Sequence, residues 1–518
     1  MSSPATLLSI VCYGLQDTRI FNPRGQPDIK NYTKVLKKTT RWAAQWVRVE
    51  FDGQTSFGQR ATVTIPRKGE LLSQVTLVVT MPDIYTPQQL AQASCPPGSF
   101  LGPIYGWTNS LGHALIDLLE LDIGGVNVDR MDGRFLEIYD ELYEPNNSLF
   151  AKNKMIQRIP DGFNPSSIGY SPTPTTVTVP LPFWFSKNCY ENALPLDALS
   201  ADAVQIHVTL KSLNQLYVSS PPIYTSPNPV IPPCGNSTAP IAGANFYYTD
   251  PLTTTQLYNS TNLNIGISGE VIPNISMPLN YQIKDMYMLC EFISLEDAEA
   301  VAFRSSQLEY RVEQHYIVPK QQTQGATNVR ISLPYNNPTK DILWVAQRPE
   351  AETLNAWFLF TRDLNARNVL ANNIPWWPDA TLNTDGQSKP AFRNAYSEPI
   401  QGAQLSFSNI IRMSHLESPS IFRSLIPLLH YRKAPLFNRY IYVYPFGMAP
   451  GASDDIDLGS CANPRGFSNW DKLPKKELHL TMNSDYNKIY HNMNIYAYVT
   501  IYNVFRVFSG RGAMLFAY

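Results

Sequence analysis

The chain has 518 residues, of which 44% are apolar and 12% aromatic, and its formal net charge at pH 7 is −1. Charged residues make up 16%, against roughly 25% in typical soluble proteins. This balanced, low charge excludes a general nucleic-acid binder, which needs surplus Lys and Arg to displace counterions. The apolar content argues against disorder, and the length fits three or four ordinary domains or two large β domains.

Targeting and cysteine signals are weak. No apolar run reaches the roughly 18 residues of a transmembrane helix. Residues 5–15 have the length of a signal-peptide core, but no basic residue precedes them, so we expect a packed N-terminal arm. The six cysteines include no C-x-x-C pair, the spacing typical of structural zinc sites and thioredoxin-like redox motifs. We therefore expect free thiols.

Apolar and polar residues alternate, or nearly so, in several segments, and this predicts strands at 60–66, 176–179, 204–210 and 477–482. Two short helices are expected, at 133–143, where Phe135, Ile138 and Leu142 share one face, and at 419–430. The pair Gly124-Gly125 predicts a tight hairpin turn. A phosphate cradle is the weaker alternative there, because no helix opens immediately after the glycines.

The same series of elements occurs twice along the chain. Each series has three strands, a helix and three or four further strands. The corresponding pairs are 60–66 with 328–334, 71–81 with 340–347, 116–123 with 403–408, 133–143 with 419–430, 181–185 with 442–448, 204–210 with 477–482, and 286–293 with 495–507.

About eight strands per series, without β/α alternation, predict an all-β fold of two tandem eight-stranded jelly rolls with short helices and long loops. We expect an N-terminal arm at 1–25, a first roll at 26–298 and a second at 299–518. The first roll would carry a long H–I loop at about 212–280, and the second a long D–E loop at about 348–397. Loops of this length are uncommon unless functional.

A search for catalytic and ligand-binding patterns finds no P-loop, H-E-x-x-H or G-x-S-x-G motif. Asp454, Asp455 and Asp457 fit a solvated acidic turn better than a calcium loop. His207 and His479 occupy equivalent strands, which favours packing on a sheet face over metal binding. Glu137, Asp140 and Glu141 on the first helix could be paired acids, but we expect them to form its charged solvent face. No enzyme activity, metal or cofactor is therefore predicted.

Two groups of residues are weaker candidates for contacts. Basic residues cluster near the N-terminus and could contact an acidic partner or an anionic surface, although the simpler interpretation of the cluster is a solvent-exposed face. They include Lys30, Lys34, Lys37, Lys38 and Arg41. N-x-S/T motifs, which mark glycosylation only in a secreted chain, occur five times. Three lie in the first long loop, at Asn236, Asn259 and Asn274.

Several segments resemble the major capsid proteins of nucleocytoplasmic large DNA viruses. The most specific are 105–141 (YGWTNSLGHALIDLLELDIGGVNVDRMDGRFLEIYDE) and 181–210 (LPFWFSKNCYENALPLDALSADAVQIHVTL). Segments 8–17, 51–81, 295–314, 441–482 and 494–510 also follow the family pattern, so the resemblance covers nearly everything outside the two long loops. One departure is 464–469 (PRGFSN), where the family usually reads proline-serine-glycine and then asparagine-x-serine. It suggests a divergent member or a paralogue.

The resemblance implies a double jelly-roll subunit that forms a homotrimeric, pseudo-hexagonal capsomer. Such capsomers tile an icosahedral shell in the virion after assembly in the host cytoplasm. Further implied partners are neighbouring capsomers and minor capsid proteins under the shell, with the inner viral membrane reached only indirectly and nucleic acid not contacted. The two long loops would face outward, toward a host surface or a decorating protein, and the basic N-terminal stretch inward. A minor capsid or scaffolding paralogue is the main alternative, and a carbohydrate-binding jelly-roll protein the more distant one.

Overall fold

The computed structural model describes most of the chain between residues 41 and 516. The described ranges are 41–84, 105–144, 148–158, 176–187, 192–219, 281–353, 355–362, 398–407, 410–415, 419–435, 439–447, 466–484 and 488–516. The predicted arm at 1–25 and Lys30, Lys34, Lys37 and Lys38 lie outside these ranges, as do 220–280 and 363–397 of the two predicted loops.

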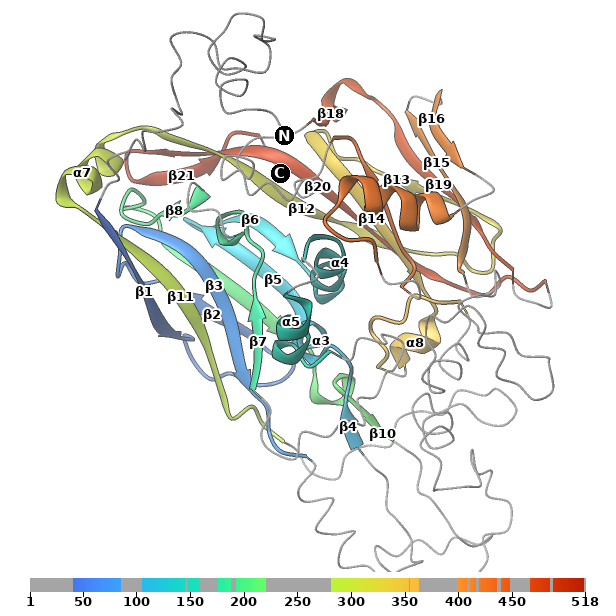
Figure 1. Ribbon diagram of the computed structural model, residues 1–518, viewed down its shortest axis with the longest axis horizontal. Coiled ribbons are helices and arrows are strands. Elements are labelled where there is room, and N and C mark those ends of the chain that lie inside the picture. Colours follow the sequence, from blue (N-terminus) through green and yellow to red (C-terminus); the bar gives the residue numbers. More distant parts are fainter. Residues whose placement is uncertain are drawn as a thin grey trace, which may run out of the picture. The chain divides into compact units, whose positions relative to one another are not determined.

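The N-terminal half of the described chain contains two main sheets, seen in the blue, green and yellow-green part of Figure 1. The first has the order β1 (Trp42–Glu50), β11 (Asp285–Leu295), β3 (Leu71–Thr80) and β7 (Thr176–Pro180), with β8 (Leu194–Pro195) also paired to β3. The second has the order β2 (Arg60–Thr64), β9 (Val204–Leu210), β5 (Ile116–Ile123) and β6 (Val126–Met131).

The C-terminal half repeats this arrangement. Its first sheet has the order β12 (Leu308–Gln322), β20 (Asn494–Phe508), β14 (Pro338–Gln347) and β17 (Ile441–Pro445), with β18 (Ser468–Asn469) on β14 and β21 (Arg511–Met514) on β20. Its second has the order β13 (Asn328–Ser332), β19 (Lys476–Met482), β15 (Ile400–Phe407) and β16 (Ile410–His415). Taken in chain order, the eight principal strands of the two halves match one for one, and each half has the connections of a jelly roll. The predicted double jelly roll is confirmed.

The cores follow from strand periodicity. In β19 every second residue is buried, as expected for a strand with one face on a core. Leu77 on β3 and Leu121 on β5 come from the two sheets of the first roll and are fully buried in one hydrophobic cluster. By contrast, β14 is buried along nearly its whole length, so both of its faces are covered. Only its centre, residues 342–346, is continuously apolar.

Helical segments fill the connections between strands. They are α3 (Leu111–Leu115), α4 (Gly133–Tyr143), α5 (Leu149–Met155), α7 (Asp297–Ser305), α8 (Pro349–Thr353), the π-helical turn η6 (Ile421–Leu425), α10 (Ile426–His430), and the 3-10 turns η1 (Trp184–Ser186), η3 (Leu213–Gln215) and η7 (Trp470–Lys472). A short two-stranded antiparallel sheet of β4 (Tyr105–Trp107) and β10 (Tyr217–Ser219) is separate from the main sheets.

The predicted hairpin turn at Gly124-Gly125 is confirmed. Ile123 pairs with Val126 across it, and the two glycines have φ of 61° and 79°. Two successive positive φ angles are typical of the type I′ turn, which suits the twist of antiparallel strands and favours glycine.

Three details differ from the sequence prediction. Residues 181–185 are not a strand, because Pro182 cannot donate to a ladder. The strand is β7 just before them, and the last two of these residues belong to η1. The helix predicted at 419–430 begins as the π turn η6 because Pro427 has no N–H to bond four residues back. The starts of the predicted loops are ordered, as η3 and β10 in one and α8 in the other.

The two halves are linked at α7. The strand before this helix, β11, pairs with β3 of the first half, and the strand after it, β12, pairs with β20 of the second. We propose that the first roll ends and the second begins within this connection, near the predicted boundary at 298 and 299.

The sequence predicts free cysteines and lacks an apolar run long enough to span a membrane. Cys290 is a free, buried thiol on β11, and the other five cysteines lie outside the described residues. Within the described part of the chain, every helix is too short or too polar to cross a membrane.

Candidate functional site

The helix α4 lies between the two jelly rolls, and side chains of both contact it. Its first turn is capped by Asp132, whose Oδ1 accepts a hydrogen bond from the amide of Phe135 at 2.7 Å. The other oxygen of Asp132 accepts a hydrogen bond from the Tyr498 hydroxyl on β20 at 2.9 Å. The N-cap of a first-half helix is thus fixed by a strand of the second half.

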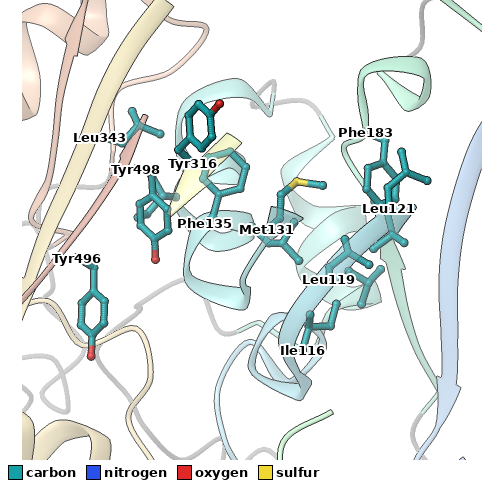
Figure 2. Close-up of a cluster of buried hydrophobic side chains, with 14 of the residues drawn as sticks. Ile116, Leu119, Leu121, Met131, Phe135, Phe183, Tyr316, Leu343, Tyr496 and Tyr498 are labelled. Carbon is teal, nitrogen blue, oxygen red and sulfur yellow. The ribbon is translucent and has the colours of Figure 1, made fainter. Parts of the chain in front are cut away.

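An aromatic contact holds the same turn. Figure 2 shows Phe135 beside Tyr498 and Tyr316, and the ring centroids of Phe135 and Tyr498 are 5.5 Å apart. Phe135 also packs on the ring of His315 at 4.5 Å. Burial of such an aromatic residue contributes about 2–3 kcal/mol, and here that burial depends on both halves.

The acidic residues of α4 form a buried ion network, so their predicted position on a solvent face is wrong. Glu137, Asp140 and Glu141 are all at most 2% exposed. Unpaired buried carboxylates would be strongly destabilising, and each of these has a cationic partner. The polar face of the helix is buried because His113 of α3, Lys152 of α5 and Arg439 of the second half pack against it.

Glu137 is the centre of this network. Its Oε2 lies 2.7 Å from Nδ1 of His113 on α3 and 2.5 Å from the Arg158 guanidinium, just after α5. Its Oε1 lies 2.9 Å from the Arg439 guanidinium, next to β17 of the second half. Burial opposes the charged form, but Arg158 and Arg439 outweigh it and hold the pKa of Glu137 well below its usual range.

Asp140 and Glu141 extend the network in two directions. Asp140 lies 2.7 Å from the ammonium of Lys152 on α5 and 3.2 Å from Arg158. Burial again opposes charge, but Lys152 and its other cationic neighbours lower the pKa of Asp140. Glu141 reaches across to Lys433 of the second half at 3.3 Å. Glu137 and Asp140 therefore serve as fixed negative charges.

A second cluster joins the halves at β6 and β12. The carboxylate of Asp129 accepts a hydrogen bond from the amide of His315 at 2.9 Å and lies 3.1 Å from the same residue's Nδ1. The neighbouring Gln314 donates its amide to the Val128 carbonyl. All of the side chains in these bonds are at most 2% exposed.

Arg134 on α4 is a further charged residue that contacts the second roll. Its guanidinium lies 2.7 Å from Glu352 on α8 and 4.0 Å from the ring centre of Tyr496 on β20. A guanidinium over an aromatic face adds a cation–π attraction to the ion pair. Three kinds of contact, apolar, ionic and cation–π, thus fix one relative orientation of the two rolls.

This arrangement does not suit proton transfer. A general acid or base works best when its pKa lies near the operating pH, whereas Glu137 and Asp140 are held charged at neutral pH. Within the described residues no group of three or more His, Cys, Asp or Glu could hold a metal ion. The charged groups at the junction therefore have a structural role: they hold the two rolls in one relative orientation.

The other predicted candidates are placed as follows. Arg41 is exposed just before β1. Lys30, Lys34, Lys37 and Lys38, the sequons at Asn236, Asn259 and Asn274, and the acidic turn at Asp454, Asp455 and Asp457 lie outside the described residues. His207 bonds to Thr62 at 2.8 Å and lies 3.1 Å from Asp122, and His479 lies 3.3 Å from Ser406 and 3.2 Å from Glu477, so both stand among polar side chains on sheet faces.

Sequence reasoning missed His113, Arg158 and Arg439 as partners of the helix acids. They are scattered over more than 300 positions, and no local pattern connects them. The helix is amphipathic, with Glu137, Asp140 and Glu141 together on its polar face. Such a face is normally exposed to solvent, so nothing in the local sequence indicated that these acids are buried.

Two family models match the chain in the same order as the two rolls. Residues 31–277 match the N-terminal domain of the major capsid protein, and residues 299–513 match the major capsid protein of large eukaryotic DNA viruses. The chain belongs to this major capsid protein family. Its function is therefore that of a viral capsid protein, and its place is the capsid.

Individual relatives agree with the family. The chain is 22% identical to the major capsid protein of Phaeocystis pouchetii virus over 99% of both chains. It is 24% identical to capsid protein 1 of Acanthamoeba polyphaga mimivirus, over 66% of this chain and 48% of that protein. The alignment thus spans nearly all of one capsid protein and about half of the other.

The fold is also that of a solved capsid. The PBCV-1 virus capsid structure matches with a TM-score of 0.61 at 20% identity, covering 94% of this chain and 100% of that chain. At this identity the similarity supports the shared double jelly-roll fold, and the two family models carry the assignment to the major capsid proteins.

Proposed function

We propose that three copies of this capsid protein form a pseudo-hexagonal capsomer, and that capsomers tile an icosahedral shell. The supporting observation is the matching strand order of the two rolls. A trimer with threefold symmetry then has six similar rolls, which approximate the corners of a hexagon. The buried junction around α4 supports this role, because a tile must keep its two rolls in one orientation.

The mass of the purified protein in solution tests this proposal. Native mass spectrometry or light scattering should give a stable species of three times the 58.4 kDa chain mass. A protein that stays monomeric or dimeric at all concentrations contradicts it. Copy number in purified particles separates a shell-forming subunit from a minor or scaffolding paralogue, since only the former is the most abundant capsid protein.

The proposed role is purely structural, without enzyme activity, metal or cofactor. The fixed charges at the junction support this. Assembly would take place in the host cytoplasm, with minor capsid proteins under the shell, an indirect relation to an inner membrane and no direct contact to nucleic acid. The near-neutral net charge of −1 supports the last point. Cross-linking of intact particles followed by mass spectrometry tests these contacts.

We further propose that the connections between β9 and β11 and between β14 and β15 face outward. In a jelly roll both kinds of connection leave the sheets at the same end. The first would carry the glycosylation candidates Asn236, Asn259 and Asn274 and meet a host surface or a decorating protein. The basic stretch from Lys30 to Arg41 would face inward. Limited proteolysis of intact particles should cut within 220–280 and spare 1–40; the reverse order of cleavage contradicts the orientation.

A carbohydrate-binding role is the remaining alternative. Jelly rolls occur in lectins as well as in capsids, but the two family models favour the capsid role. Glycan-array binding by the purified protein distinguishes the two.

A further inference from the structure

A donor-rich pocket lies at the junction, next to but distinct from the buried network of Glu137. It encloses about 90 Å³, and its lining residues come in equal numbers from the two rolls. Tyr139 and Lys187 belong to the first roll, and Arg311, Lys340 and Arg432 to the second. Anything bound here would touch both rolls at once.

The pocket has more positive than negative charge. Four cations line it, Lys187, Arg311, Lys340 and Arg432, whereas Glu313 is its only carboxylate among the described residues. Each carboxylate oxygen of Glu313 forms an ion pair with one lysine: Oε2 lies 2.6 Å from Nζ of Lys187, and Oε1 lies 2.6 Å from Nζ of Lys340.

A second carboxylate reduces the surplus without removing it. Asp341 follows Lys340 in β14. Burial opposes the charged form of Lys340, but Glu313 and, to a smaller extent, Asp341 raise its pKa. The Oδ2 of Asp341 accepts hydrogen bonds from Tyr143 at 2.9 Å and Tyr431 at 3.0 Å, and Asp341 does not line the pocket. With Asp341 included, the four cations still outnumber the carboxylates by two among the residues that the structure describes.

The remaining polar groups of the lining add donors. Burial raises the pKa of the Tyr139 hydroxyl and of the Tyr502 hydroxyl, so both keep their protons at neutral pH and can donate. Asn192 adds an amide. A ligand that accepts many hydrogen bonds and carries negative charge would complement this set.

We propose that this pocket binds a phosphate-class oxyanion, either free phosphate or the phosphate group of a monoester. A phosphate has five heavy atoms, and a cavity of about 90 Å³ has room for several water-sized groups at roughly 10–15 Å³ each. A phosphate monoester carries about −1.5 to −2 charge near neutral pH, which matches the surplus. Arginine and lysine are the side chains that bind phosphate oxygens best.

Room for the rest of a monoester exists beside the pocket. A larger cavity of about 670 Å³ shares Tyr139, Tyr143, Lys187 and Arg432 with it. Arg432 stands at the shared rim and is exposed, so it can reach a ligand from either side. A bound oxyanion would tie the two rolls together and stabilise the folded subunit, because a ligand that binds only the native state shifts unfolding by mass action.

Thermal unfolding of the purified protein in inorganic phosphate tests the proposal. The comparison is sodium chloride at equal ionic strength, which screens surface charges equally. We expect a melting temperature that rises with phosphate concentration and saturates, with calorimetry giving one site per chain. O-phosphoserine in place of phosphate tells a monoester ligand from the free ion: tighter binding of the monoester supports the former, equal or weaker binding the latter, and no binding of either overturns the proposal.

Two variants and one control make the test specific. Arg432→Gln removes an exposed cation at the rim and Lys187→Met one within the pocket, while Lys340 remains bonded to Glu313. Each should weaken phosphate binding about tenfold or more, as expected for a charge-assisted hydrogen bond. Arg330→Gln, at an exposed position of β13, should leave binding unchanged. An equal response of all three variants and the parent protein would overturn the site, whatever the oligomeric state, so this outcome is independent of the trimer.

Discussion

Arg439 and Glu137 lie 302 positions apart in the chain, and their side chains meet at 2.9 Å with both at most 1% exposed. One belongs to the second jelly roll and the other to α4 of the first. A buried ion pair of this kind is costly to break, because the remaining charge has no substitute for water. The pair therefore makes the orientation of the two rolls specific.

Replacement of Arg439 by Met should destabilise the protein by about 3–5 kcal/mol, the usual cost of leaving a buried charge unpaired. Urea unfolding measures the change. The double variant Arg439→Met with Glu137→Gln should lose less than the sum of the single variants, because the two side chains interact directly. Arg330→Gln is the exposed control and should change stability by less than about 0.5 kcal/mol. Additive single effects would show that the pair contributes nothing.

Acidification should lower the stability of the folded protein through the Glu137 carboxylate. The pKa of Glu137 lies well below its ordinary value of 4.5 when folded, because Arg158 and Arg439 outweigh the opposing effect of burial. The unfolded chain then binds more protons below about pH 4.5, so this contribution is complete above that pH and is lost as the pH falls further. The stability difference between the parent and Glu137→Gln should shrink as the pH falls below about 4.5 in urea unfolding series. Glu296→Gln, at an exposed site before α7, should track the parent; a constant difference for Glu137→Gln would contradict the linkage.

Gly133 at the start of α4 should tolerate no side chain. A Cβ there would lie 2.6 Å from the Ile116 carbonyl oxygen and closer still to that of His113. Both obstacles are backbone and cannot move aside cheaply, so Gly133→Ala should cost about 3 kcal/mol. Gly125→Asn is the matched control, because its φ of 79° suits asparagine and nothing lies within 4 Å. Circular dichroism melting curves compare the two, and a neutral Gly133→Ala would show that α4 is packed less closely than described.

Cys290 should react slowly in the folded protein. It is a free, fully buried thiol, and burial raises its pKa to about 12. The reactive thiolate is therefore scarce near neutral pH. Iodoacetamide followed by mass spectrometry should modify Cys290 in denaturant and leave it largely unmodified in native buffer. Rapid native labelling would show that β11 opens readily.

The sequence predicted the fold well because the physical signals were local. Alternation within β19 and the Gly124-Gly125 turn each depend on neighbouring residues, and the repeat showed which segments of the two halves correspond. The junction was predicted poorly because its contacts are not local. Glu137 looks like a surface residue until Arg158 and Arg439 are brought to it by other elements, and the clash that requires Gly133 comes from α3 and the start of β5.

The most direct test of the whole account is a cryo-electron microscopy reconstruction of the purified protein. We expect a particle with threefold symmetry and six similar two-sheet rolls, in which α4 lies between the rolls of each subunit and the Glu137 side chain contacts Arg439. A monomeric or dimeric particle would contradict the proposed capsomer, and two halves that do not superpose strand for strand would contradict the double jelly roll itself.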